Sequence, residues 1–341
     1  MMNYLRTNMS LVIKTIEMHA GGGGVRIVQS GYPKIIGDTL HDKLQYAQKN
    51  LDHLRKMLTH EPRGSNRLHG IVQVEHDNPE ADMAILFLYT EGYSNFCGHA
   101  TIGLGRYAVD HGIVRRVSPE TAIKIQCPTG LVTAHVEYEN GRAGAVRFEC
   151  VPAFVYATDL MINMVDYGDI KYDISVGGSF YIYTNIKQFG LDLVTSSAAD
   201  IKATAHKMMK AVGDTITMTH PVDDQPAVIG GVYFFSGPLA SLPDTINEIC
   251  IFFETVCRSP CGSGSCGLLA LLHHKGLIKE GDVRRFVNSK TQSVFSGRVV
   301  KQVKVKDTPA VIPEISGKAY YTGECTFFCE QDDPQPSFLI K

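Results

Sequence analysis

Two segments that lie far apart in the chain share a pattern that constrains the fold more than any other feature. In the first, Cys97 is followed by glycine and by an apolar, helically spaced run that ends at Gly112. In the second, Cys261 is followed by glycine and by a similar run that ends at Gly276. When the two cysteines are aligned, the two terminal glycines also coincide. We interpret the pair as an internal repeat with one thiol in each half.

Each run predicts a helix that begins directly after its cysteine. A helix N-terminus lowers the pKa of a thiol, and its free backbone N–H groups attract a carboxylate. Two such thiols on either side of a bound carboxylate would suit two-base proton transfer at the neighbouring Cα. The alternative is a pair of buried structural cysteines, but the matching contexts of Cys97 and Cys261 favour a site.

The segments around each predicted helix follow a common plan. Residues 11–28 read as strand, glycine turn and strand, while residues 39–58 and 198–212 have the spacing of amphipathic helices. Many short alternating strands around one apolar helix predict a barrel-like sheet wrapped on that helix. We therefore expect an α/β fold of two pseudo-symmetric lobes, residues 11–165 and 166–330, with terminal strands that cross between them.

Composition narrows the classes of partner. The 341 residues carry 33 basic and 35 acidic side chains, a net charge of -2, which favours neither nucleic acid nor an anionic membrane. The longest apolar runs have the length of strands, and the first ten residues do not resemble a secretion signal. The nine cysteines form no disulfide framework. These features predict a cytoplasmic protein that binds a small molecule.

The motifs carry a family resemblance. Cys97-Gly98-His99 and Arg258-Ser259-Pro260-Cys261-Gly262-Ser263-Gly264 resemble the two signature motifs of the proline racemase superfamily, which includes proline racemase, 4-hydroxyproline epimerase and trans-3-hydroxy-L-proline dehydratase. Segments similar to the dehydratase branch cover nearly the whole chain: they begin at Met18, Glu61, Glu91, Cys127, Val151, Gly177 and Tyr321. The resemblance implies a diaminopimelate-epimerase-like fold, no cofactor and usually a homodimer, and we assign no residue to a metal.

The resemblance also implies roles for particular residues. Cys97 and Cys261 would be the two catalytic bases, and His99 would help to hold the ring nitrogen of the substrate. The substrate-binding positions that it implies are Gly98, His99, Cys257, Gly262 and Ser263, of which the two glycines and Ser263 would hold the carboxylate by their backbone amides.

Four positions, at three places in the chain, depart from the family pattern. Animal-type dehydratases have Thr where this chain has Cys261, so the cysteine restores the base pair expected of a racemase or epimerase. The family has Asp in place of Cys257 and Glu-Pro in place of Gly23-Gly24. A neutral thiol at position 257 would lose a charge-assisted hydrogen bond to the substrate ammonium. The chain therefore has either a different substrate or impaired activity.

Three functions remain open. The first is a racemase or epimerase that abstracts the Cα proton of proline or hydroxyproline with Cys97 and Cys261. The second, which the residues favour almost equally, is trans-3-hydroxy-L-proline dehydration to pyrroline-2-carboxylate. The third is an inactive homologue that binds an amino or imino acid. A zinc site made of Cys257, Cys261 and Cys266 with His273 or His274 is disfavoured, because the gap before Cys266 lies in a glycine turn and helix.

Overall fold

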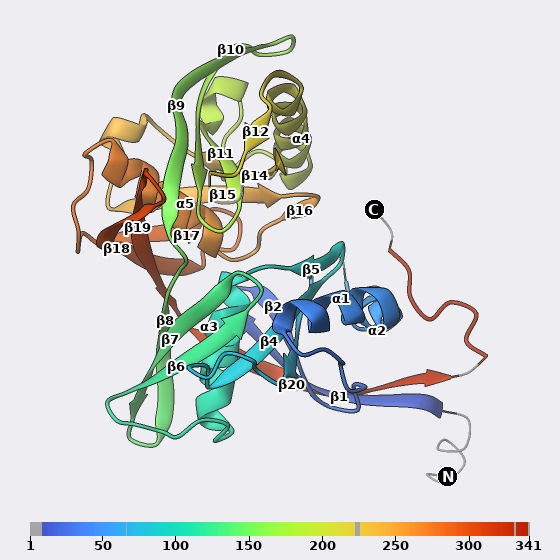
Figure 1. The fold of residues 1–341 in the computed structure, drawn as a ribbon. Helices are drawn as coiled ribbons and strands as arrows, with labels where there is room; N and C mark the ends of the chain where they lie inside the picture. The colour runs from blue at the N-terminus through green and yellow to red at the C-terminus, as the bar shows by residue number, and fades with distance from the viewer. Residues whose placement is uncertain (1–8, 66, 222–225, 331, 340–341) are drawn as a thin grey trace. The chain divides into compact units, whose positions relative to one another are not determined.

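The computed structural model of the protein describes residues 9–65, 67–221, 226–330 and 332–339. The chain divides into two compact units, the first formed by Met1–Val146 with Lys318–Lys341 and the second by Arg147–Gly317 (Figure 1). The expected division at residues 165 and 166 falls instead inside the second unit, between two strands that pair as a hairpin. The last strand returns to the first unit, where it pairs with the first strand.

In its described residues, the first unit is a mixed sheet with three helices. Its elements are β1 (Met9–Ala20), β2 (Gly23–Ser30), α1 (Leu40–Asn50), α2 (Asp52–Thr59), β3 (His69–Val74), β4 (Met83–Tyr89), β5 (Gly92–Ser94), α3 (Gly98–Asp110), β6 (Glu120–Cys127), β7 (Gly130–Glu139), the first half of β8 (Arg142–Glu149) and β20 (Ala319–Glu330). The strands pair in the order β20-β1-β2-β3-β4-β6-β7, with β5 paired to β4. The β2–β3 and β4–β6 pairs are parallel.

The glycine turn predicted between the first two strands is confirmed. Gly21 and Gly22 form a two-residue hairpin loop with φ of 57° and 86°. Positive φ at both central residues defines the type I′ turn, whose twist matches that of the flanking strands. Residues 39–58, in contrast, form two helices and not one, because the backbone leaves helical geometry at Leu51 (φ -124°, ψ 10°). The apolar spacing continues across this break, so periodicity alone does not reveal it.

The second unit closes into a barrel. Its elements are β9 (Ala153–Met164), β10 (Gly168–Val176), β11 (Phe180–Asn185), α4 (Ala198–Thr215), β14 (Ile229–Phe235), β15 (Thr245–Phe252), β16 (Thr255–Val256), α5 (Gly262–His274), β17 (Arg284–Asn288), β18 (Val294–Val305) and β19 (Thr308–Gly317), with a small β12 (Met218–Thr219) and β13 (Pro226–Ala227) pair and short 3-10 turns at Ile186–Phe189 and Leu239–Ser241. The strands pair in the order β9-β10-β11-β14-β15-β17-β18-β19, and β19 pairs again with β9.

Each unit has one central helix, and the two helices match. Both α3 and α5 contain 13 residues and begin directly after their cysteine. Gly112 and Gly276 adopt the left-handed conformation, with φ of 66° and 70°, and the residue after each glycine donates its N–H to the carbonyl five residues earlier, at Ala108 and Leu272. This is the Schellman motif, which the sequence repeat reproduces at both helix ends.

The central helices are buried because they are apolar on nearly every side. Helix α3 packs on β1, β2, β7 and β20, and α5 packs on β9, β10, β18 and β19. The opposite faces of the sheets are covered by α1 and α2 in the first unit and by α4 in the second (Figure 1). The prediction of a barrel-like sheet about a central helix is therefore confirmed in the α/β class. Within the described ranges, none of the helices is long and apolar enough to span a membrane.

Candidate active site

Helix α3 carries the first predicted thiol at its N-terminus. Cys97 is the N-cap residue, with extended backbone angles, and its carbonyl accepts hydrogen bonds from the Thr101 N–H and hydroxyl, each at 2.9 Å. The side chain of Cys97 does not cap the helix, so its sulfur is available for other contacts. The first N–H groups of a helix have no partner within the helix. Gly98 and His99 therefore begin α3 with backbone donors beside the thiol.

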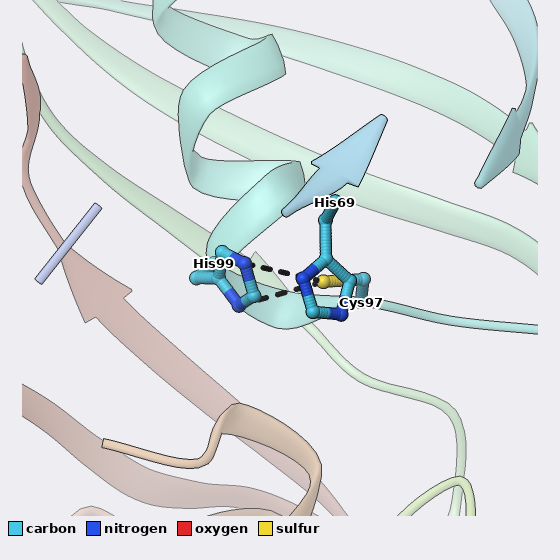
Figure 2. A group of neighbouring side chains, drawn as sticks. All are labelled: His69, Cys97 and His99. Carbon is cyan, nitrogen blue, oxygen red and sulfur yellow. Dashed lines mark hydrogen bonds between the residues drawn. The ribbon is translucent and has the colours of Figure 1, made fainter. Parts of the chain in front are cut away.

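Two histidines surround this thiol. His99, in the first turn of α3, approaches Cys97 Sγ with Nδ1 at 3.5 Å and Nε2 at 3.8 Å (Figure 2). His69 comes from β3, and its ring meets that of His99 edge to face, with 4.5 Å between centroids. Burial first, and then the nearby His69, hold the pKa of His99 well below its usual 6.5. His99 is therefore a neutral imidazole beside the thiol.

Gly23 gives His99 its room. A Cβ atom placed on Gly23 would lie 3.0 Å from Cδ2 of the His99 ring, whereas one on Gly24 would meet only the tip of the Leu68 side chain. Real Cβ atoms rarely approach so closely. The glycine at position 23, where the family has another residue, thus leaves space for the ring of His99, the histidine next to Cys97.

Helix α5 carries the second predicted thiol in the same position. Cys261 is the N-cap residue, and its Sγ accepts a hydrogen bond from the Gly264 N–H at 3.4 Å. Tyr181 Oη lies 3.7 Å from the sulfur, and the same hydroxyl is 2.6 Å from Ser263 Oγ. Gly262 and Ser263 occupy the first two helical positions, where backbone N–H groups lack partners within the helix.

Close packing explains the glycines of the second motif. A Cβ on Gly264 would lie 2.6 Å from the ring of Tyr233, and one on Gly267 would lie 2.1 Å from the hydroxyl of Tyr183. Tyr183 donates to the Gly264 carbonyl at 2.8 Å. The glycines therefore let the first turn of α5 rest directly on two buried tyrosines, which fixes the position of the Cys261 backbone.

The second site contains two further thiols. The sulfur atoms of Cys250, Cys257 and Cys261 all lie within 4.8 Å of one another. Cys250 is in β15, and the Cys257 N–H donates to the Cys250 carbonyl at 2.9 Å, which sets the two residues opposite each other in the β15–β16 hairpin. Cys250 and Cys261 are buried, while Cys257 is partly exposed.

The cluster favours ionisation of one thiol over the others. Hydrogen bonds from Cys250 and Cys257, followed by those from the Gly264 N–H and Tyr181, hold the pKa of the Cys261 thiol well below its usual value. Burial raises the pKa of Cys250 well above that value, and hydrogen bonding to the Cys261 thiolate together with burial does the same for Cys257. Of the three thiols, that of Cys261, at the helix N-terminus, therefore ionises most readily.

Sequence reasoning missed some members of both sites. Cys250 lies in an apolar strand, His69 is an isolated histidine, and Tyr181 belongs to an aromatic run that usually indicates core. Only the strand register carries Cys250 to the cluster. The residues considered above for a zinc site do not come together. Cys266 lies beside Cys150. His273 and His274 are at the C-terminal end of α5, about 18 Å along the helix axis from its N-terminus.

Fold and site together define an α/β protein of two units, each with a cysteine at the N-terminus of its central helix and polar groups around it. The chain belongs to the proline racemase family, whose model matches residues 15–338. The diaminopimelate-epimerase-like fold class is confirmed by solved structures of proline racemase and phenazine-biosynthesis (PhzF) type.

Three relatives illustrate the range of the family. The chain is 44% identical to a trans-L-3-hydroxyproline dehydratase from Saccoglossus kowalevskii, covering 95% of this chain and 100% of the relative. It is 36% identical to a proline racemase from Clostridioides difficile, in an alignment that covers 96% of this chain and 98% of the relative. The structure of a hydroxyproline epimerase from Agrobacterium vitis, solved with bound trans-4-hydroxy-L-proline, superposes on this chain with a TM-score of 0.88 at 25% identity. The superposition covers 98% of this chain and 96% of the epimerase. Isomerases and lyases both occur among these enzymes.

Proposed function

We propose that the protein is a cofactor-independent racemase or epimerase that removes and returns the Cα proton of proline or a hydroxyproline. The observation that carries the proposal is the Cys261 thiol, which lies at a helix N-terminus with a pKa held well below its usual value. Inversion at Cα requires a second reactive thiol, whereas elimination of water requires only one. Cys97, at the N-terminus of the matching helix, supplies the other thiol.

The proposed reaction uses one thiolate and one thiol. The Cys261 thiolate takes the Cα proton from one face of the substrate, and the Cys97 thiol delivers a proton to the other face; the roles exchange in the reverse direction. Backbone N–H groups of Gly98, Gly262 and Ser263 hold the carboxylate, where the positive ends of the helices also stabilise charge that develops on it. His99, as a neutral imidazole, accepts a hydrogen bond from the ring ammonium.

A second function is favoured by the relative at 44% identity, which is a dehydratase. In that reaction Cys97 would be the base, the 3-hydroxyl of trans-3-hydroxy-L-proline would leave, and Cys261 would stand where the animal-type enzymes have Thr. The product would be pyrroline-2-carboxylate. The two functions differ in whether they require the Cys261 thiol.

Deuterated water separates the two functions. The purified protein is incubated with L-proline, trans-4-hydroxy-L-proline or trans-3-hydroxy-L-proline, and products are followed by NMR and chiral chromatography. Deuterium at Cα with loss of optical purity supports the racemase or epimerase. A pyrroline product from trans-3-hydroxy-L-proline alone supports the dehydratase.

Two substitutions sharpen the test. Cys261→Thr should reduce inversion at least about 100-fold, because it removes a general acid–base group, yet it should leave dehydration intact. Cys97→Ser should abolish either reaction, and Cys325→Ser, in β20, is the matched control. If no isomer of hydroxyproline or proline is turned over by the unmodified protein, both functions are refuted and the inactive amino- or imino-acid-binding homologue is left.

A further inference from the structure

The three-thiol cluster of the second unit has the composition of a site for a thiophilic metal ion. We propose that Cys250, Cys257 and Cys261 bind a zinc ion, with the carboxyl of Glu248 as the fourth ligand. Of these three thiols, only that of Cys261 exchanges a proton with the substrate in the proposed reaction, and Cys250 belongs to neither signature motif.

The spacing of the sulfurs suits zinc. Tetrahedral zinc binds thiolate sulfur at about 2.3 Å, which sets the sulfurs of one site about 3.8 Å apart. All three sulfurs already lie within 4.8 Å of one another, so small side-chain rotations bring them onto a common ion. Soft thiolate ligands also select zinc over magnesium or calcium, which prefer oxygen.

The local fold holds the ligands in place. The β15–β16 hairpin fixes Cys250 and Cys257 opposite each other, and the three residues after Cys257 lead directly to Cys261 at the start of α5. Asn288 secures that connection, since its Nδ2 donates to the carbonyls of Cys257 and Ser259 at 3.0 and 3.3 Å. Cys257 and Cys261 thus have the C-x3-C spacing of a zinc knuckle, and the hairpin supplies the third thiol.

Glu248 provides an independent observation. It lies two residues before Cys250 in β15, on the same face of the strand, and its side chain is completely buried. The Cys261 backbone and the Asn288 side chain lie beside its carboxyl, but neither oxygen makes a hydrogen bond of regular geometry within the described part of the chain. A buried carboxyl without such partners is costly. The Glu248 carboxyl is not one of the donor atoms that lie within 4.8 Å of one another, so a rotation of its side chain would have to bring it to a metal ion at the three thiols, which would then satisfy it.

Ion entry is possible from the side of Cys257, the partly exposed member of the cluster. An ion bound there would occupy the sulfur of Cys261. If Cys261 is a catalytic base, zinc inhibits inversion reversibly; this consequence rests on the proposed function, whereas binding itself does not.

Cobalt reports binding without any measurement of activity, because thiolate-bound Co²⁺ absorbs in the near ultraviolet. The reduced, chelator-treated full-length protein is titrated with Co²⁺ and then with Zn²⁺. The His69–Cys97–His99 group also offers three donor atoms within 4.8 Å of one another, so the titration is performed on Cys97→Ser. We expect one equivalent of Co²⁺ with a thiolate charge-transfer band that Zn²⁺ abolishes.

Two variants in the same background test the ligands. Cys257→Ser, at a partly exposed position, and Glu248→Gln should each weaken Co²⁺ binding at least about tenfold, the lower end of what loss of even an outer-shell partner costs a metal site. Cys325→Ser should leave the band unchanged. Absence of the band in Cys97→Ser, or its persistence at full affinity in Cys257→Ser, would overturn the proposal. In the unmodified protein, where inversion can be measured, zinc binding to this cluster without inhibition of inversion would instead contradict the assigned role of Cys261.

Discussion

Removal of the Tyr181 hydroxyl should raise the pKa of the Cys261 thiol. The hydroxyl lies 3.7 Å from Cys261 Sγ and contributes, after the two neighbouring thiols and the Gly264 N–H, to the low pKa of that thiol. Hydrogen bonds to charged groups contribute about 1.5–3 kcal/mol. Because 3.7 Å is long, we take the lower end, which corresponds to about one pKa unit. Tyr181→Phe should therefore shift the Cys261 titration upward by about one pH unit.

The assay is the rate of iodoacetamide alkylation at Cys261 between pH 5 and 9, read by mass spectrometry of the peptide that contains it. Only the thiolate reacts, so the pH of half-maximal rate reports the pKa. Tyr183→Phe is the matched control: it also removes one buried hydroxyl from β11, but that hydroxyl donates to the Gly264 carbonyl. Each variant should lose about 1 kcal/mol of stability. Equal shifts in both variants, or none in Tyr181→Phe, would refute the reasoning.

Other substitutions test the packing and protonation of the two sites. Gly23→Ala brings a Cβ to 3.0 Å from the His99 ring, so we expect turnover to fall about tenfold, with Gly24→Ala as the control that changes little. Gly264→Ala, whose Cβ would lie 2.6 Å from a buried tyrosine ring, should lower the unfolding free energy by about 1–3 kcal/mol in denaturant titrations. Gly213→Ala, where a Cβ meets no atom within 4 Å in helix α4, should raise that free energy by about 0.5–1 kcal/mol; a loss in both variants would argue against close packing as the cause. The pKa of His99 in the folded protein lies below its usual 6.5, so below pH 6.5 the unfolded chain binds a proton at this residue that the folded protein does not. The free energy of unfolding should therefore decrease below pH 6.5 by up to about 1.4 kcal/mol per pH unit. An equal decrease in His99→Gln between pH 7 and 5.5 would contradict this.

The features that the sequence predicted well are local ones. The starts of α3 and α5 follow from a cysteine at a turn and an apolar run, and their ends follow from glycines that accept the left-handed conformation at residues 112 and 276. The hairpin loop at residues 21–22 depends only on two adjacent glycines. In each case a few neighbouring residues determine the backbone, so one sequence suffices to predict it.

The features that the sequence did not predict depend on long-range pairing. The barrel of the second unit closes where β19 meets β9, far apart in the chain, and no periodicity encodes that contact. Cys250 joins the thiol cluster only because the β15–β16 register sets it opposite Cys257. The unit boundary after residue 146 likewise depends on the pairing of β9 with β10, which keeps both strands in the second unit.

Cys257, which departs from the Asp expected at its position, acquires a physical explanation from the cluster. As a neutral thiol it donates a hydrogen bond that lowers the pKa of Cys261. A carboxylate there would remove the donor and place a negative charge beside the thiolate, and both changes raise a thiol pKa. The cysteine therefore favours an ionised Cys261 in the absence of substrate, while under the proposed function the substrate ammonium would lose a counter-charge.

The substitution Cys257→Asp tests how the residue at position 257 changes the pKa of Cys261. We expect the half-maximal pH of Cys261 alkylation to rise by at least about one unit, because loss of one charge-assisted hydrogen bond alone is worth that much. Cys257→Ser, which retains a donor hydroxyl, should shift it less. Substrate should then restore part of the ionisation in the Asp variant, since its ammonium would neutralise the new carboxylate. An unchanged or lower half-maximal pH in Cys257→Asp would mean that the thiol at 257 does not support the Cys261 anion, and the departure would then be better explained by impaired catalysis.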